Sequence, residues 1–346
     1  MSKKCATGNS AVFLCNLHSE HLNTPLVVGG VTLRNRVFLA PMSGVTDLPF
    51  RRLAYGHGAG LVVSEMVASG ELAKGRGDTQ TRIKRDGDMP HMVQLAGRDS
   101  AAMAEAARIA EGEGADIIDI NMGCPAKKVT GGYCGSALMR NLDHAVSLID
   151  SVVGAVSVPV TVKMRLGWDD ESRNAPELAA RAEQSGVQMI TVHGRTRCQF
   201  YEGKADWVAI AAVKAVVSVP VVANGDCANS ADAVAMLEAS GADAIMVGRA
   251  NYGAPWTTGS IVGNAVGTPN NIGEYVIAHY REMLGFYGIE SGLRQARKHL
   301  RWYLDRNAPD VSSALRQIAL QSFQPSEVEQ ALRDAFARSA EVQEAA

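Results

Sequence analysis

Three features that mark common protein classes are missing from this sequence. None of the six cysteines (Cys5, Cys15, Cys124, Cys134, Cys198 and Cys227) forms a C-x-x-C pair, which argues against a zinc site or a disulfide framework and for a reducing compartment. No apolar run approaches the roughly 20 residues that cross a bilayer. The net charge of -2 excludes only a globally basic, histone-like binder. The sequence predicts a cytoplasmic protein that binds no metal and does not enter a membrane.

Short β-branched runs alternate with alanine-rich helical segments from about residue 26. Eight runs can be counted: RVFLAP, LVVSEM, MVQLAG, DIIDINMG, VTVKMRLG, MITVHGR, VVANGD and AIMVGR. Runs that are apolar on both faces belong in parallel sheets covered by helices. Eight strand-helix units predict an α/β fold, a (β/α)8 TIM barrel over residues 25–262. A doubly wound open sheet is the alternative, and the strand count argues against it.

The segments before and after the predicted barrel differ from it in sequence pattern. Residues 1–24 are interpreted as a flexible extension, and LVVGGVTLRNRV (26–37) as a hairpin that plugs the bottom of the barrel. Strand-like runs vanish after residue 262, and interleaved charges at helical spacing predict a small all-helical C-terminal domain over 270–338. The last residues, RSAEVQEAA, are expected to fray.

Polar residues gather where the predicted strands end, and in a TIM barrel those ends build the site. Lys163 lies between apolar residues, where an unpaired ammonium is costly, so an anionic ligand is expected. Glycines at the ends of the last two strands indicate a phosphate site. Each residue alone could be an ordinary polar residue at a strand terminus.

Six longer motifs resemble those of the tRNA-dihydrouridine synthases, bacterial B type, over about residues 25–309. They are APMSGVTDLPFRRL, DINMGCPAKKV, VTVKMRLGWDD, TVHGRTRCQFYEGKADW, VANGD and VGRANYGAPW. The resemblance implies an FMN-dependent barrel followed by a helical tRNA-binding domain. It implies reduction of specific tRNA uridines to dihydrouridine, with NADPH or NADH as electron donor.

The resemblance also assigns residues by position. The cofactor-binding residues that it implies are Pro41, Met42, Ser43, Gln94, Lys163, His193, Asn224, Gly225, Asp226, Gly248 and Arg249. Ser43 departs from the family, where alanine is commoner. The resemblance places the catalytic cysteine at Cys124, while Cys134, where a small residue is usual, is a rival acid.

Reduction of the 5,6 double bond of uracil needs a hydride at carbon 6 and a proton at carbon 5. A cysteine thiol ordinarily has a pKa of about 8.5, so it is mostly protonated at neutral pH and can supply that proton. A free cysteine can also be a small buried hydrophobe. Asn121, His193 and Arg195 could bind the uracil edge, although Arg195 could instead pair with Glu202 or Asp206.

A uridine in folded tRNA must be turned out to reach a barrel site. A basic stripe at helical spacing could hold the RNA backbone: Arg294, Arg297, Lys298 and Arg301. This stripe could equally be a solvated helix face. Lys127 and Lys128 could likewise contact tRNA phosphates or be an ordinary solvated pair. The modified tRNA position stays undetermined, and a monomer is expected.

Two rival functions differ in what they need. An FMN barrel acting on a free pyrimidine, such as a dihydroorotate dehydrogenase, requires no basic helical domain. A flavin-containing RNA-binding protein without turnover would not reoxidise its flavin on adding tRNA.

Overall fold

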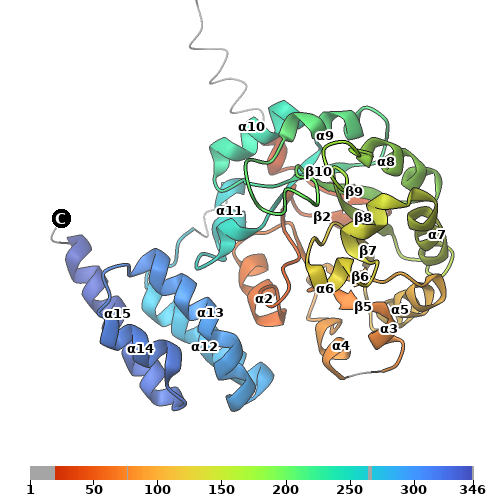
Figure 1. The fold of residues 1–346 in the computed structure, drawn as a ribbon. Coiled ribbons are helices and arrows are strands. Elements are labelled where there is room, and N and C mark those ends of the chain that lie inside the picture. The colour runs from red at the N-terminus through yellow and green to blue at the C-terminus, as the bar shows by residue number, and fades with distance from the viewer. Residues whose placement is uncertain (1–19, 76, 264–266, 345–346) are drawn as a thin grey trace, which may run out of the picture.

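The computed structural model describes residues 20–75, 77–263 and 267–344 and contains a closed parallel barrel (Figure 1). Its eight strands are β3 (Val37–Leu39), β4 (Leu61–Val63), β6 (His91–Ala96), β7 (Ile117–Met122), β8 (Val160–Arg165), β9 (Met189–His193), β10 (Val221–Asn224) and β11 (Ala244–Val247). Pairing of β4 with both β3 and β6 closes the ring, and the short β5 (Val67–Ala68) lies beside β6. The predicted TIM barrel is confirmed, and the open sheet is wrong.

Helices connect the barrel strands. They are α2 (Leu48–Gly56), α3 (Ser69–Leu72), α4 (Gly77–Arg82), α5 (Ser100–Gly112), α6 (Lys127–Thr130), the 3-10 helix η1 (Gly135–Arg140), α7 (Leu142–Val153), α8 (Ala175–Gln184), α9 (Trp207–Lys214), α10 (Ser230–Ser240), the 3-10 helix η2 (Arg249–Asn251) and α11 (Thr257–Val262). α10 shows how the sequence sets such limits. The Asn229 side chain accepts a hydrogen bond from the N–H of Asp232 at the start, and Gly241 ends the helix at φ 63°.

An antiparallel hairpin closes the bottom of the barrel, as the sequence predicted. Its strands β1 (Leu26–Val28) and β2 (Val31–Leu33) pair in register Leu26 to Leu33. Leu26, Val28 and Leu33 pack in one buried cluster with residues from the first positions of the barrel strands, such as Ile117 and Met189. The hairpin therefore supplies the apolar floor, and the opposite, carboxyl end of the strands stays available for a ligand.

The chain already packs against the barrel before the hairpin. Leu22 is buried in the main core, and its carbonyl accepts a hydrogen bond from the N–H of Arg36 at 2.9 Å. Ordered packing thus begins earlier than residue 25, where the sequence suggested that the extension ends. The expected extension at 1–19 and the final residues 345–346 lie outside the described residues.

Four helices form the C-terminal unit, drawn in blue beside the barrel in Figure 1: α12 (Ile272–Tyr287), α13 (Ile289–Asn307), α14 (Ser313–Gln321) and α15 (Pro325–Glu344). They share their own buried cluster, which includes Tyr280, Leu300 and Leu332. Hydrogen bonds tie this unit to the barrel, including Tyr287 Oη to Asp47 Oδ2 at 3.0 Å. The predicted helical C-terminal region is confirmed. None of the described helices is long and apolar enough to span a membrane.

Candidate active site

A cavity of about 1450 Å³ opens at the carboxyl end of the barrel strands. Residues from the ends of strands all around the barrel line it, including those predicted on β3, β6, β7, β8, β9, β10 and β11. The predicted residues that line it are Pro41, Met42, Ser43, Gln94, Asn121, Cys124, Lys163, His193, Asn224, Gly225, Asp226, Gly248 and Arg249. Strand register explains the convergence, because Asn121 lies opposite Lys163, and His193 lies between Arg165 and Asn224.

A chain of hydrogen bonds links the barrel interior to the cysteine loop. The buried Asp119 carboxylate accepts from Thr161 Oγ1 at 2.6 Å and from Gln94 Nε2 at 2.7 Å. Gln94 Oε1 then accepts from Asn121 Nδ2 at 2.7 Å, which leaves Asn121 Oδ1 to accept from the N–H of Cys124 at 2.9 Å. Since an ionised carboxylate only accepts, Asp119 fixes which way both amides point. Hydrogen bonds that start at Asp119, beneath the cavity, therefore fix the position of the loop that carries Cys124.

Two buried charges of opposite sign lie on neighbouring strands, Lys163 at the cavity wall and Asp119 within β7 beneath it. Burial and, to a lesser degree, the charge of Arg165 lower the pKa of Lys163 to about 8, whereas Asp119 opposes the shift. Burial raises the pKa of Asp119 to about 6, against hydrogen bonds from Gln94 and Thr161 and the charge of Lys163. Lys163 Nζ donates to Asn224 Oδ1 at 3.1 Å. The ammonium is paired with an amide rather than a carboxylate, so an anionic group in the cavity would stabilise it.

Cys124 is half-buried at the cavity wall, and its backbone is held on both sides. Asn121 accepts from its N–H, and its carbonyl accepts from the N–H and the hydroxyl of Ser136 at 3.1 and 2.9 Å. Cys134 also lines the cavity, but its thiol donates to the carbonyl of Gly132 at 3.3 Å, and burial raises its pKa. Both thiols are thus within the same cavity, and only Cys134 has its sulfur engaged by a described acceptor.

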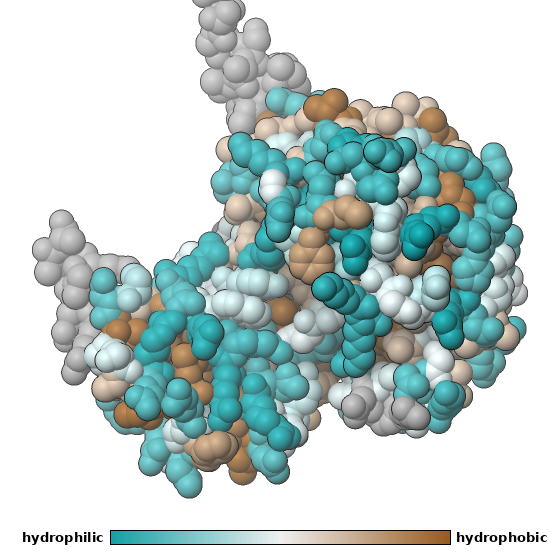
Figure 2. Space-filling model, in the orientation of Figure 1, coloured by the Kyte–Doolittle hydropathy of each residue, from teal (hydrophilic) through white to brown (hydrophobic). Residues whose placement is uncertain are grey.

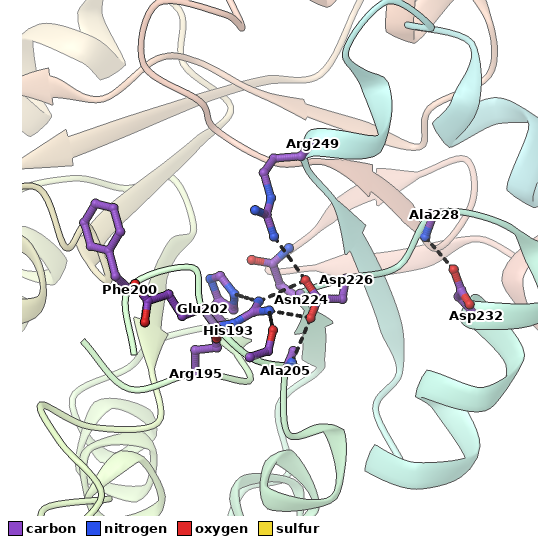
Figure 3. A network of polar contacts seen from close by, with 12 residues as sticks. His193, Arg195, Phe200, Glu202, Ala205, Asn224, Asp226, Ala228, Asp232 and Arg249 are labelled. Atoms are coloured by element: carbon purple, nitrogen blue, oxygen red, sulfur yellow. Dashed lines mark hydrogen bonds and ion pairs between the residues drawn. The ribbon is translucent and has the colours of Figure 1, made fainter. Parts of the chain in front are cut away.

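Arg195 forms a buried ion pair with Asp226. Figure 3 shows its guanidinium directed at Asp226, with Nη2 to Oδ2 at 2.6 Å and Nη1 to Oδ1 at 3.0 Å. It also donates to the carbonyls of Glu202 and Gly203, and the residue is 1% exposed. The alternative ion pairs with the carboxylates of Glu202 or Asp206 are wrong, because the carboxylate partner comes from the end of β10, whereas the expected uracil contact stays a prediction.

Asp226 pairs with two cations at the mouth, and its expected part in cofactor binding stays a prediction. Its carboxylate pairs with Arg195 and, at 3.1 Å, with Arg249 Nη2, while Oδ2 also accepts from the N–H of Ala205 (Figure 3). Because a carboxylate repels phosphate, the side chain of Asp226 positions these cations and does not itself contact a phosphate. Arg249 stays about half exposed and free to approach an anion at the mouth.

Burial and positive neighbours keep His193 neutral. Its pKa lies well below the usual value because of burial, and Lys163, Arg165, Arg195 and Arg249 add repulsion. Arg195 Nη1 lies 3.3 Å from His193 Nε2. Because arginine only donates, Nε2 accepts and the ring proton lies on Nδ1.

The glycine turns after β10 and β11 leave backbone donors at the mouth. Gly225 has φ 120°, and a Cβ there would lie 2.7 Å from the Ala205 side chain, so only glycine fits this turn. The N–H groups of Gly225, Gly248 and Arg249 meet no acceptor within residues 20–75, 77–263 and 267–344. N–H groups without an acceptor in the described part of the chain, beside Arg249, form a suitable cradle for a phosphate.

Only part of the predicted basic stripe faces solvent. Arg294 and Arg301 are exposed on α13, and Arg297 lies 5.2 Å over the exposed Phe323 ring; we call these three the α13 arginines. Lys298 is half-buried instead. Burial lowers its pKa, Asp47 and Glu65 oppose that shift, and its Nζ lies 3.2 Å from the place where a Gly44 Cβ would stand. Lys298 thus lies beside the barrel loop after β3, and its assignment to RNA binding stays a prediction.

Three residues with a clear part in this site were not among the assigned site residues, although Arg165 was expected at the mouth. Asp119 fixes the direction in which the Gln94 and Asn121 amides point. The sequence contained a signal for this role, because the carboxylate stands two residues before Asn121 in an otherwise apolar strand. Arg165 donates to the carbonyls of Gly123, Thr196 and Phe200 and thereby joins three loops of the mouth. Tyr201 lies under both Arg165 and Arg249, a contact between distant segments that no local pattern reveals.

Comparison with known proteins agrees with this geometry. A family model described as dihydrouridine synthase (Dus) matches residues 38–341. A probable tRNA-dihydrouridine synthase of Rhizobium leguminosarum bv. phaseoli is 58% identical over 86% of this chain and 94% of its own. The tRNA-dihydrouridine synthase B of Klebsiella pneumoniae is 47% identical over 82% and 91%.

Solved structures share the fold at low identity. A 2-naphthoyl-CoA reductase has a TM-score of 0.58 at 12% identity and covers 93% of this chain and 70% of its own. Morphinone reductase in complex with tetrahydroNAD has a TM-score of 0.51 at 18% identity, with 72% and 92% covered. Fold and site together define a TIM-barrel protein with a cationic cavity at the carboxyl end of its strands. The chain belongs to the dihydrouridine synthase family, as its motifs predicted.

Proposed function

We propose that this protein reduces specific uridines of tRNA to dihydrouridine, with FMN as cofactor and NADPH or NADH as electron donor. The observation that carries the proposal is the juxtaposition of a half-buried thiol, Cys124, with a buried ammonium, Lys163, in one large cavity. Family membership supplies the reaction class, since relatives at 47–58% identity are named for it.

The residues present fit FMN. Lys163 lacks a carboxylate partner and suits an electron-rich ring, and Gln94 offers an amide whose orientation is fixed. The unpaired N–H groups of Gly225 and Gly248, with Arg249, suit the phosphate. When bound, FMN supplies the hydride that adds to carbon 6 of uracil. Pro41, Met42 and Ser43 would complete the cofactor wall, with the neutral His193 opposite.

Cys124 is the proposed proton donor to carbon 5 of uracil. Hydride addition at carbon 6 leaves negative charge between carbon 5 and the carbonyl at carbon 4, so one proton must arrive at carbon 5. The loop held by Asn121 and Ser136 presents the thiol at the cavity wall without a competing acceptor among the described residues. A positioned acid of this kind contributes about 10² to 10⁴ in rate.

The helical domain is the proposed grip on tRNA. A uridine must leave its stack to enter the cavity, and the protein must hold the backbone while it does so. Figure 2 shows a notch between the helical domain and the barrel, with hydrophilic surface on both sides. The α13 arginines supply positive charge on this unit.

One experiment tests the whole proposal. The purified protein is bleached anaerobically with NADPH, and reoxidation of its flavin is then followed after adding unmodified tRNA or free uridine. We expect rapid reoxidation and dihydrouridine formation with tRNA only. Equal reoxidation by free uridine would indicate a free-pyrimidine reductase, and a preparation that cannot be reconstituted with FMN would refute the cofactor assignment.

A further inference from the structure

Two arginines flank one tryptophan on the lip of the barrel. The guanidinium carbons of Arg197 and Arg140 lie 4.7 and 4.9 Å from the centroid of the Trp168 ring. Arg140 ends η1 after β7, Trp168 follows β8, and Arg197 follows β9, so the three residues come from neighbouring loops at the carboxyl end of the strands. The two charges are therefore no more than about 10 Å apart, the sum of those two distances.

Backbone contacts hold these loops together. The N–H groups of Arg197 and Cys198 donate to the carbonyls of Gly167 and Trp168 at 3.0 and 2.8 Å. The Asn174 side chain donates to the carbonyl of Met139, beside Arg140, at 2.8 Å. The arginines are thus held in place before any ligand arrives, which reduces the entropy lost on binding.

Neither guanidinium is neutralised within the described chain. Arg140 and Arg197 form no ion pair with a described carboxylate, and the buried Nε of Arg197 has no acceptor among described residues. Asp170 and Asp206, on the neighbouring loops, both pair with Arg173, and Asp169 accepts hydrogen bonds from Ser172. Two uncompensated guanidinium groups on one lip point to an anionic ligand with several acceptor oxygens.

We propose that Arg140 and Arg197, held by Trp168, bind the phosphodiester backbone of RNA on the lip of the barrel opposite the helical domain. This inference rests on the proposed tRNA function. The helical domain contacts the other side of the mouth, where Arg306 donates to the carbonyl of Ala250 after β11. RNA across the mouth would then be held from both sides, with the target base between them.

Arg165 connects this lip to the cavity. Its Nη1 donates to the carbonyls of Thr196 and Phe200, which flank the segment that carries Arg197. Phe200 itself is exposed at the mouth, at φ 53°. Phosphate binding at Arg197 would therefore act on the loop that lines the substrate entrance.

The test compares binding of an unmodified tRNA transcript to protein variants across a salt series, measured by fluorescence anisotropy. The Arg140→Gln/Arg197→Gln double variant should give a slope of log affinity against log salt that is shallower by about 1.4 to 1.8, because each lost RNA phosphate contact removes about 0.7 to 0.9. The Arg140→Lys/Arg197→Lys double variant keeps both charges and should keep the slope. The control is Arg108→Gln/Arg181→Gln, which removes two exposed arginines of the outer helices α5 and α8 and should leave the slope unchanged.

The outcomes separate this inference from the proposed function. If wild-type protein forms dihydrouridine but the glutamine variant keeps the wild-type slope, the phosphate site is refuted and the function stands. If the lysine variant lowers the salt dependence of tRNA binding as much as the glutamine variant does, the arginines support the local structure instead of binding phosphate, and the inference is overturned. If wild-type protein does not bind tRNA at all, both fail. Equal flavin content in all variants shows that the cavity is intact.

Discussion

Replacing Lys163 by methionine should stabilise the protein without its ligand and weaken its cofactor binding. The stem volume is nearly kept, while the buried ammonium is removed. The pKa of Lys163 is about 8 in the folded protein against 10.5 for the free side chain. A lowered pKa means that the folded state binds the proton less well than the unfolded state. The charge therefore costs stability below pH 8, and this cost is relieved as the pH rises from about 8 to 10.5.

The size of the effect follows from the same shift. At about 1.4 kcal/mol per pKa unit, the buried charge costs about 3 kcal/mol at pH 7. Methionine also loses the hydrogen bond to Asn224, worth about 1 kcal/mol, and leaves Asp119 without its nearest positive charge. A net gain of about 1 to 2 kcal/mol remains, which corresponds to a rise in Tm of roughly 1 to 3 °C for a chain of this length.

The assay is thermal unfolding of flavin-free protein together with FMN titration at pH 7. Lys214→Met is the matched control, because Lys214 pairs with Asp243 at 2.8 Å and should gain nothing on losing its charge. At pH 10.5 the advantage of Lys163→Met should shrink, since the wild-type lysine is then mostly neutral. An unchanged or lower Tm with unchanged FMN affinity would refute the view that Lys163 holds a charge for the ligand.

Other perturbations test separate parts of the site. Cys124→Ala and Cys124→Ser should retain flavin reduction by NADPH but slow single-turnover uridine reduction by about 10² to 10⁴, whereas Cys134→Ala should be nearly neutral; the reverse pattern would identify Cys134 as the acid. Asn121→Ala removes the acceptor for the Cys124 N–H, so uridine reduction should fall by at least about tenfold, and an unchanged rate would show that the loop needs no such support. Changing the α13 arginines to glutamine should reduce the salt slope of tRNA binding by about 2 to 3, and adding Lys298→Gln should lower it no further, because Lys298 faces the barrel.

The fold could be predicted because its signals are local and repeated. Each barrel strand is a short apolar run followed by a helix, and the count of eight then selects a closed ring. The floor hairpin was also visible, since its two short apolar strands flank Gly29 and Gly30. What could not be predicted is where Lys298 points. Helical spacing places it with Arg294 and Arg301, but the packing of α13 against the β3 loop turns it inward.

The sequence correctly predicted which residues line the cavity, but it did not predict their ion-pair partners. Strand ends correctly marked which residues line the cavity, because parallel strands finish at one edge. Ion pairs depend on loop conformation instead. Arg195 could reach acids in its own loop, yet it pairs with Asp226 because the turn at Gly225 brings that carboxylate over β9. Residue spacing does not predict the conformation of that turn, so the ion-pair partner of Arg195 can be identified only from the structure.

The segment after β11 joins the cavity to the helical domain over very few residues. Gly248 and Arg249 face the mouth, and the carbonyl of Ala250 accepts from Arg306 at 2.8 Å. Tyr252, which lines the cavity, stacks on Trp302 of α13 with ring centroids 3.9 Å apart and planes 8° apart. A close aromatic stack of this kind adds about 0.5 to 1.5 kcal/mol to the packing of the two units. The wall that would hold the cofactor phosphate is thus also the surface on which α13 rests.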